Sequence, residues 1–381
     1  MQKKLLHLVI VSLLIAFTLS ACTPAANVTP AAAPEADVRA ELAQEAEPEA
    51  EQESEQESEA APEAVDPAPP DCIHTLVVTD HAGRMVTIDR VVERIISGFY
   101  ISTSAIIALG LEDKLVGIEA RADMRPIYAL AAPHLLELPN VGTAREFNME
   151  AALALRPDLV ILPMRQQDAA EILEELGILV LLVEPENPDK LINMINMIGS
   201  VAGGWRNADA LDQFYRQSLR EIEEMTADIA ERPTVYMAGV GSYLSTSPGG
   251  MYQSSLIEMA GGINIAGDIE GVSRIDVSYE QLLAWDPDVI IIPPEADFRP
   301  EDILTNPQLA QLTAVQNGRV YHMPGYFEAW DSPVPSFTLG IRWLMSALHP
   351  DIYSMDVMWE YAADFYAEFY GFDIDLELIK R

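Results

Sequence analysis

The sequence predicts an α/β protein in which two similar lobes with mainly parallel sheets are joined by one long α-helix. The first observation is a repeat. Residues 150–163 read EAALALRPDLVILP and residues 280–293 read EQLLAWDPDVIIIP, and the two match in register at an offset of 130. Each block reads as a short amphipathic helix, a Pro-Asp turn and an apolar run typical of a buried parallel strand. This register favours two lobes of one kind.

The second observation is the stretch from Asn207 to Arg232, which contains no proline or glycine. Its apolar side chains recur at helical spacing, Asn207 is a favourable N-cap residue, and Pro233 prevents continuation. A helix of this length suits a connection between two bodies better than a layer inside one. We therefore expect residues 188–232 to form a connecting helical segment.

The first 22 residues read as a targeting segment, a lipoprotein signal peptide, and not as part of the fold. Lys3 and Lys4 precede an apolar run, and Leu19-Ser20-Ala21-Cys22 resembles a lipoprotein cleavage box. Cys22 would then become the lipid-bearing N-terminus and anchor the protein outside the cytoplasm, in a periplasm or at the cell surface. An ordinary secretory signal that happens to precede a cysteine is the alternative.

Residues 23–71 are predicted to be a disordered acidic tether. They contain no aromatic residue and no glycine but eight prolines, and thirteen acidic residues lie between Glu35 and Asp66. Such a segment cannot bury enough apolar surface to offset its ordering entropy. The chain as a whole carries a formal net charge of −37, which argues against nucleic acid and anionic lipid as partners.

Cysteine and histidine offer no metal or redox chemistry in this sequence. With Cys22 lipidated, Cys72 has no partner for an intrachain disulfide, and the six histidines are scattered. We therefore expect no protein-bound metal and no cofactor.

The folded body should comprise an N-terminal lobe (72–187) and a C-terminal lobe (233–381) on either side of the connecting segment. Strand and helix patterns alternate, which predicts mainly parallel sheets. A hairpin is expected around Asp80-His81-Ala82-Gly83, and Ser102-Thr103-Ser104 should cap a helix. Two apolar helices, 337–348 and 357–370, should close the chain.

These segments together resemble the periplasmic-binding family of iron-complex and vitamin B12 importers. The family implies two Rossmann-like lobes, a ligand cleft between them, and delivery of the ligand to an ABC permease with its ATPase. A monomeric substrate-binding protein, not an enzyme, is therefore expected. From about His74 to Arg381, the order and spacing of these motifs carry the resemblance: VTDHAGRMVTI, ERIISGF, ALGLEDKLVGI, the two Pro-Asp blocks, EMAGGINIAGD and WDSPVPSFTLG.

The resemblance also implies site residues. Arg121, Arg145 and Arg274 fall in loops at the mouth of the cleft, where arginine suits carboxylate and oxyanion ligands. Pairing of each with a local carboxylate, such as Glu146 or Asp276, is the alternative. The helix N-termini near Ser102 and Ser254 should add backbone donors. Four aromatic residues are expected either to wall the ligand or simply to pack the loops: Tyr100, Tyr243, Tyr326 and Trp330.

Glu150 and Glu280 occupy matching positions in the two repeat blocks. The resemblance places there the glutamates that dock on permease arginines. Stabilisation by the helix dipole is the structural alternative, because both residues open a helix.

These residues predict an anionic ligand: a ferric chelate or siderophore first, with a molybdate- or tungstate-like oxyanion or cobalamin as alternatives. A two-lobed α/β enzyme would need catalytic groups, and the candidates, Asp158 and Asp288, lie in Pro-Asp turns that favour turn capping. A structural or adhesive surface lipoprotein would suit the acidic tether, but its body would be all-β.

Overall fold

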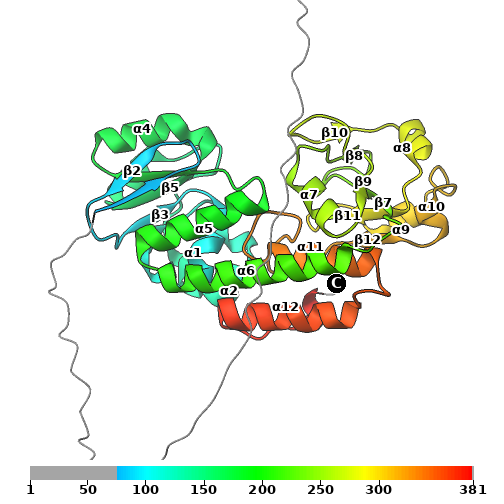
Figure 1. Ribbon diagram of the computed structural model, residues 1–381. Helices are drawn as coiled ribbons and strands as arrows, with labels where there is room; N and C mark the ends of the chain where they lie inside the picture. Colours follow the sequence, from blue (N-terminus) through cyan, green and yellow to red (C-terminus); the bar gives the residue numbers. More distant parts are fainter. Residues whose placement is uncertain (1–74, 380–381) are drawn as a thin grey trace, which may run out of the picture. The chain divides into compact units, whose positions relative to one another are not determined.

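The computed structural model describes residues 75–379 of the 381-residue chain. The targeting segment, Cys22, the acidic tether and Cys72 lie outside the described residues. Helices and strands alternate within this range, and each lobe contains a parallel sheet (Figure 1), so the expected two-lobed α/β fold is confirmed. None of the helices described between residues 75 and 379 is long and apolar enough to cross a membrane.

The N-terminal lobe is built on a four-stranded parallel sheet with the order β4-β3-β5-β6. Alternate residues of β5 enter different hydrophobic clusters, Leu159 and Ile161 on one face and Val160 and Leu162 on the other. Because both faces are buried, the strand reads as a continuous apolar run. The strands are β3 (Ile95–Ser97), β4 (Leu115–Gly117), β5 (Leu159–Pro163) and β6 (Leu179–Val183).

The first helix of this lobe starts earlier than the sequence predicts. Phe99 is its N-cap residue, and Ser102 lies inside the helix, where its hydroxyl donates to the Phe99 carbonyl oxygen at 2.7 Å. The expected Ser-Thr-Ser cap is therefore wrong. The helices are α1 (Tyr100–Ala108), α2 (Pro126–Ala131), α3 (Met149–Ala154), α4 (Gln167–Glu175) and α5 (Pro188–Ala202), with 3-10 turns η1 (Glu112–Lys114), η2 (Ala122–Met124), η3 (Pro133–Glu137) and η4 (Met164–Gln166).

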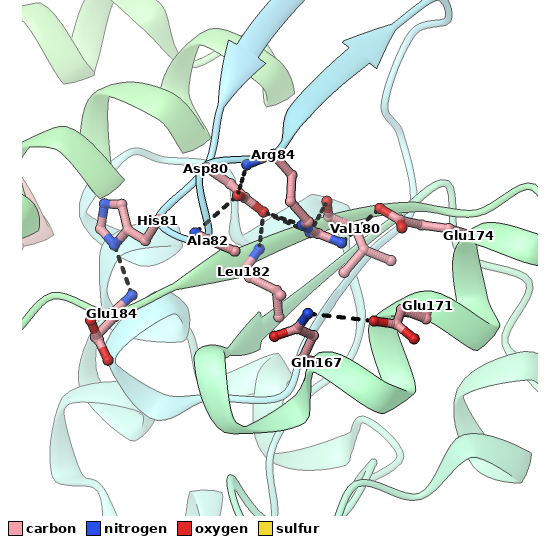
Figure 2. Close-up of polar contacts among 10 residues, drawn as sticks. All are labelled: Asp80, His81, Ala82, Arg84, Gln167, Glu171, Glu174, Val180, Leu182 and Glu184. Carbon is pink, nitrogen blue, oxygen red and sulfur yellow. Dashed lines mark hydrogen bonds and ion pairs between the residues drawn. The ribbon is translucent and has the colours of Figure 1, made fainter.

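A β-hairpin of β1 (Leu76–Thr79) and β2 (Met85–Ile88) packs beside the edge strand β6, as the sequence predicts around Asp80 (Figure 2). Asp80 Oδ1 accepts hydrogen bonds from the backbone N–H groups of Ala82 and Arg84, both at 3.0 Å. Its Oδ2 accepts from the backbone N–H of Leu182 at 3.1 Å and pairs with the Arg84 guanidinium at 2.6 Å. One carboxylate thus holds the turn and joins it to β6.

The C-terminal lobe repeats this plan with a four-stranded parallel sheet in the order β12-β11-β7-β9. The strands are β7 (Thr234–Met237), β9 (Ile263–Asn264), β11 (Val289–Ile292) and β12 (Val320–His322), beside an antiparallel pair of β8 (Ser245–Thr246) and β10 (Ile275–Asp276). The helices are α7 (Tyr252–Met259), α8 (Tyr279–Trp285), α9 (Pro300–Leu304) and α10 (Thr313–Gln316).

The internal repeat is confirmed in three dimensions. The side chains of Asn148 and Ser278, 130 residues apart, are the N-caps of α3 and α8. Asp158 Oδ2 accepts from the backbone N–H of Arg94 at 2.9 Å, just before β3, and Asp288 Oδ2 accepts from that of Thr234 at 2.8 Å, at the start of β7. Both aspartates tie neighbouring strands together, as turn capping requires, and neither lines the cavity described below.

The long helix α6 runs from Trp205 to Thr226 and packs against α5, α7 and α11 (Figure 1). Its N-cap is Gly204, three residues before the expected cap Asn207, whose side chain instead donates to the Leu109 carbonyl oxygen at 2.8 Å. It ends six residues before Arg232, where the chain turns toward β7. The helix exists as predicted, but its first and last residues differ from the prediction.

Of the closing helices, α11 packs against α6, and α12 reaches α1 in the N-terminal lobe. These helices are α11 (Phe337–Leu348), α12 (Met355–Tyr370) and the short α13 (Leu376–Ile379). α12 contacts both α11 and α1, and Phe214 of α6 lies 5.4 Å from Phe365 between ring centroids. One hydrophobic cluster therefore includes residues of α6, α11, α12 and both sheets.

Candidate functional site

A cavity of about 980 Å³ lies at the carboxyl edge of the N-terminal sheet and faces the C-terminal lobe. Each of the four strands is followed by a residue that lines the cavity. These residues are Phe99 after β3, Glu119 after β4, Arg165 after β5 and Glu184 after β6. The opposite wall is formed mainly by Gly250 to Gln253, where α7 begins. The carboxyl ends of parallel strands are where open α/β sheets usually bind ligands.

The charged residues of the cavity carry a positive excess. Three acidic residues, Glu119, Glu184 and Glu186, line it together with five basic ones: Arg121, Arg125, Arg145, Arg165 and Lys190. Lys190 is neutralised locally, because its Nζ lies 2.8 Å from a carboxylate oxygen of Glu184. The arginines thus give a cationic surface to a chain whose net charge is −37.

Three of the arginines have no carboxylate partner in the described part of the chain. Arg121, Arg145 and Arg165 are exposed. Among residues 75–379, no carboxylate oxygen of an Asp or Glu lies within 4.0 Å of a guanidinium nitrogen of any of the three. Arg145 in particular does not pair with Glu146, which the sequence left open. Arg121 has a positive φ of 68°, a conformation that is uncommon outside glycine and often marks functional positions.

Arg125 is a cavity residue that the sequence did not indicate. Its guanidinium lies 3.9 Å from the centroid of the Tyr100 ring, and its Nε lies 3.7 Å from Glu119 Oε1. Glu119 is buried and accepts hydrogen bonds from Thr103 at 2.6 Å and from Tyr128 at 2.7 Å. Burial raises the pKa of Glu119. The Arg125 guanidinium thus lies over Tyr100 within ion-pair distance of a buried carboxyl group, but its Nε has no hydrogen-bond partner among residues 75–379.

Arg274 lies behind the cavity wall and not in it. Its guanidinium donates to the Ala238 carbonyl oxygen at 3.0 Å and to the Ser247 hydroxyl at 3.1 Å. Its closest carboxylate is Asp331, at 3.9 Å, and not Asp276. Burial lowers the pKa of Arg274 and raises that of Asp331 to about 6. Arg274 therefore makes its contacts within the C-terminal lobe and does not line the cavity.

Of the four aromatic residues expected at the ligand, the structure places only Tyr100 in the cavity. The Tyr243 hydroxyl bonds that of Tyr279 at 3.0 Å, and Trp330 is buried with its Nε1 donating to the Tyr366 hydroxyl at 3.1 Å. Tyr326 lines a separate hollow of about 240 Å³ beside α2 and α13. Tyr243, Tyr326 and Trp330 therefore fit the alternative, in which aromatic residues pack the loops and do not contact the ligand.

Glu150 and Glu280 are exposed in the first turns of α3 and α8, and no cation lies within 4.0 Å of either among residues 75–379. The pKa of Glu280 is lowered, first by a bond from its own backbone N–H and then by the Ser278 hydroxyl. In the N-terminal lobe, the loop that carries Arg145 leads directly into α3. A cavity residue and one of these glutamates are therefore close in sequence.

The described residues offer no obvious site for a bare metal ion. Between residues 75 and 379, no group of three or more His, Cys, Asp or Glu side chains is arranged to hold one.

Comparison with known proteins gives one family and several relatives. A family described as "Periplasmic binding protein" matches residues 95–327. The molybdate-binding protein MolA of Haemophilus influenzae is 25% identical over 321 residues, which cover 77% of this chain and 90% of the relative. A vitamin B12-binding protein of Vibrio cholerae is 28% identical over 237 residues, which cover 60% and 80%.

Solved structures show the same fold. A periplasmic solute binding protein from Veillonella parvula is 27% identical with a TM-score of 0.72, covering 80% of this chain and 96% of that chain. MolA bound to molybdate is 24% identical with a TM-score of 0.70, covering 79% and 99%. The two-lobed architecture is therefore shared with proteins that bind small solutes.

Proposed function

We propose that this chain, which belongs to the periplasmic binding protein family, captures an anionic metal complex between its lobes and passes it to a membrane permease. Members of this family are the extracytoplasmic substrate-binding proteins of ABC importers, and they are binders and not enzymes. The finer parts of the proposal are the ligand class, the docking residues and the lipid anchor.

The observation that carries the ligand class is the unpaired arginine set. Arg121, Arg145 and Arg165 line the cavity without carboxylate partners among the described residues, and Arg125 is held beside them. Isolated cations in a partly enclosed site are stabilised by an anionic ligand, and arginine bonds carboxylates and oxyanions in a bidentate manner. A neutral corrinoid would leave these positive charges without a counter-charge, which argues against cobalamin as the ligand.

The size of the cavity favours a chelate over a bare oxyanion. Sites for organic ligands typically measure roughly 300–1,000 Å³, and this cavity, at about 980 Å³, lies at the upper end. A ferric complex with carboxylate ligands combines suitable bulk with negative charge. A molybdate-like oxyanion is the second candidate, because the relative MolA is described as molybdate-binding.

Removing a cavity arginine is expected to weaken binding of the anionic ligand. Arg145→Ala should reduce affinity by about 1.5–3 kcal/mol for each charged hydrogen bond lost. Calorimetry with ferric citrate and with molybdate measures the change, and Arg220→Ala, an exposed position on α6, is the matched control. Unchanged affinity in Arg121→Ala/Arg145→Ala, or tight binding of a neutral corrinoid by the wild type, would argue against the proposal.

The lipid anchor is tested independently of the ligand. Cys22→Ser is expected to release the full chain from membranes, because lipoprotein processing would supply the two or more acyl chains that stable anchoring needs. Membrane fractionation measures the release, and Cys72→Ser, at the only other cysteine, is the control. A wild type that is already soluble, or a Cys22→Ser protein that stays bound, would contradict the anchor.

A further inference from the structure

Three arginines that have no carboxylate partner among residues 75–379 line the cavity from three different loops. Arg121 follows β4, Arg165 follows β5, and Arg145 lies in the loop before α3. All three are exposed, so a ligand in the cavity can reach them. Like charges repel one another, and one ligand can use all three only if the loops keep them together.

The loop that carries Arg145 is a tight turn joined to the loop after β4. The Thr143 N–H donates to the Glu146 carbonyl oxygen at 2.9 Å, and the Glu146 N–H donates back to the Thr143 carbonyl oxygen at 3.1 Å. Gly142 has a φ of 94°, which favours glycine, and a Cβ there would clash with the Glu146 carbonyl oxygen. The Gly142 carbonyl oxygen accepts from the Ala120 backbone N–H at 2.7 Å. Backbone bonds therefore fix both the shape of the turn and its place beside the loop after β4.

A side chain joins the same turn to η4, the 3-10 turn that follows β5. Gln166 Nε2 donates to the Ala144 carbonyl oxygen at 3.1 Å. The donor follows Arg165 and the acceptor precedes Arg145, so this bond links the backbone positions next to two cavity cations. The amide nitrogen must face Ala144, because a carbonyl oxygen only accepts. Unlike the backbone bond to the loop after β4, this link can be removed by a substitution.

Taking the proposed function as its basis, we propose that Gln166 is a positioning residue that holds the Arg145 turn against η4. Gln166 does not line the cavity, so it acts on the ligand through the arginines on either side of its hydrogen bond. The linked loops then present Arg121, Arg145 and Arg165 as one array, which is arranged before the ligand arrives. Such preorganisation reduces the entropy cost of binding and favours a ligand whose anionic groups match the array.

The width of this array indicates the class of ligand. The loops that carry Arg121 and Arg165 follow β4 and β5, which are separated by β3 in the sheet. Two inter-strand spacings place these strands about 10 Å apart. Every charged residue described at the cavity belongs to the N-terminal lobe, so the anionic groups of the ligand should all face this array. We therefore expect a complex with two or more carboxylates on one side, in preference to a compact oxyanion such as molybdate.

The test is a double-mutant cycle followed by calorimetry, with ferric citrate and sodium molybdate as probes. Gln166→Met keeps the length of the side chain and removes the donor, and it should weaken ferric citrate binding about two- to tenfold, the effect of one neutral hydrogen bond. In the Arg145→Ala background the same substitution should have no further effect, because the side chain that Gln166 positions is gone. Gln166→Asn, which keeps the amide but shortens its reach, should behave like Gln166→Met.

Gln167→Met is the matched control. The Gln167 side chain donates to Glu171 Oε1 at 3.4 Å (Figure 2), and it does not line the cavity, so its removal should leave ferric citrate affinity unchanged. The salt dependence of affinity is a second readout. Salt screens charge contacts, so raising the ionic strength should weaken ferric citrate binding less in Gln166→Met than in the wild type.

The outcomes distinguish this inference from the proposed function. Weaker binding in Arg145→Ala with full affinity in either Gln166 variant would overturn the inference alone. So would an equal loss from Gln166→Met in both backgrounds, an equal loss in Gln167→Met, an unchanged salt dependence, or molybdate bound more tightly than ferric citrate by the wild type. Failure of both probes to bind the wild type, or unchanged affinity in Arg145→Ala, would overturn the proposed function and the inference with it.

Discussion

Reversing the charge of both docking candidates, in Glu150→Arg/Glu280→Arg, is expected to abolish transport and to leave ligand affinity unchanged. The two carboxylates occupy the same place in the two repeats, the second residue of α3 and of α8. Both are exposed, and no cation among residues 75–379 lies within ion-pair distance of either. A permease that presents one cation to the glutamate of each lobe would detect the spacing of the two lobes.

The control must separate docking from the helix-dipole effect, because an acid in a first turn also stabilises its helix. Asp168→Arg/Glu301→Arg reverses two exposed first-turn acids, one in each lobe, on α4 and α9. Uptake of labelled ligand by cells and calorimetry on the purified proteins are measured for both double variants. Equal loss of uptake in the control, or a loss of affinity or folding in Glu150→Arg/Glu280→Arg, would support the structural explanation.

The parts of the fold that could be predicted have local causes. The repeat, the Pro-Asp turns and the apolar strands are visible in the sequence, because a strand buried on both faces needs apolar residues at every position. Helix ends depend on distant partners. Asn207 was expected to cap α6, but its side chain bonds the Leu109 carbonyl oxygen, 98 positions earlier in the chain.

The site was partly predictable, through the family resemblance. The resemblance implied that Tyr100, Arg121 and Arg145 lie at the cleft, and all three line the cavity. Aromatic residues indicate burial as readily as ligand contact, and Trp330 proved to be a core residue. Arg125 was missed because its place beside Tyr100 and the buried Glu119 arises from tertiary packing, which no local sequence pattern reveals.

Replacement of Asp80 by alanine is expected to lower the free energy of unfolding markedly. Its carboxylate is fully buried, and Figure 2 shows its bonds to Ala82, Arg84 and Leu182. Asp80→Ala would leave backbone N–H groups without acceptors and a partly buried Arg84 without this carboxylate. Leaving a buried donor without its acceptor costs about 1–3 kcal/mol. The shift of the urea midpoint at constant slope, followed by circular dichroism, measures it.

Two further variants show whether charge or hydrogen bonding is responsible. Glu174→Ala removes the other carboxylate of Arg84, at 2.9 Å and 41% exposed, and should cost about 0–1 kcal/mol because solvent screens that pair. Asp80→Asn should fall between the two. Its oxygen can keep the bonds from Ala82 and Arg84, while its amide nitrogen would face the Leu182 N–H and the guanidinium, which are both donors. A cost for Asp80→Ala no larger than that for Glu174→Ala would contradict this account. The network bears on the site as well, because β6 runs from Leu182 directly into Glu184 at the cavity.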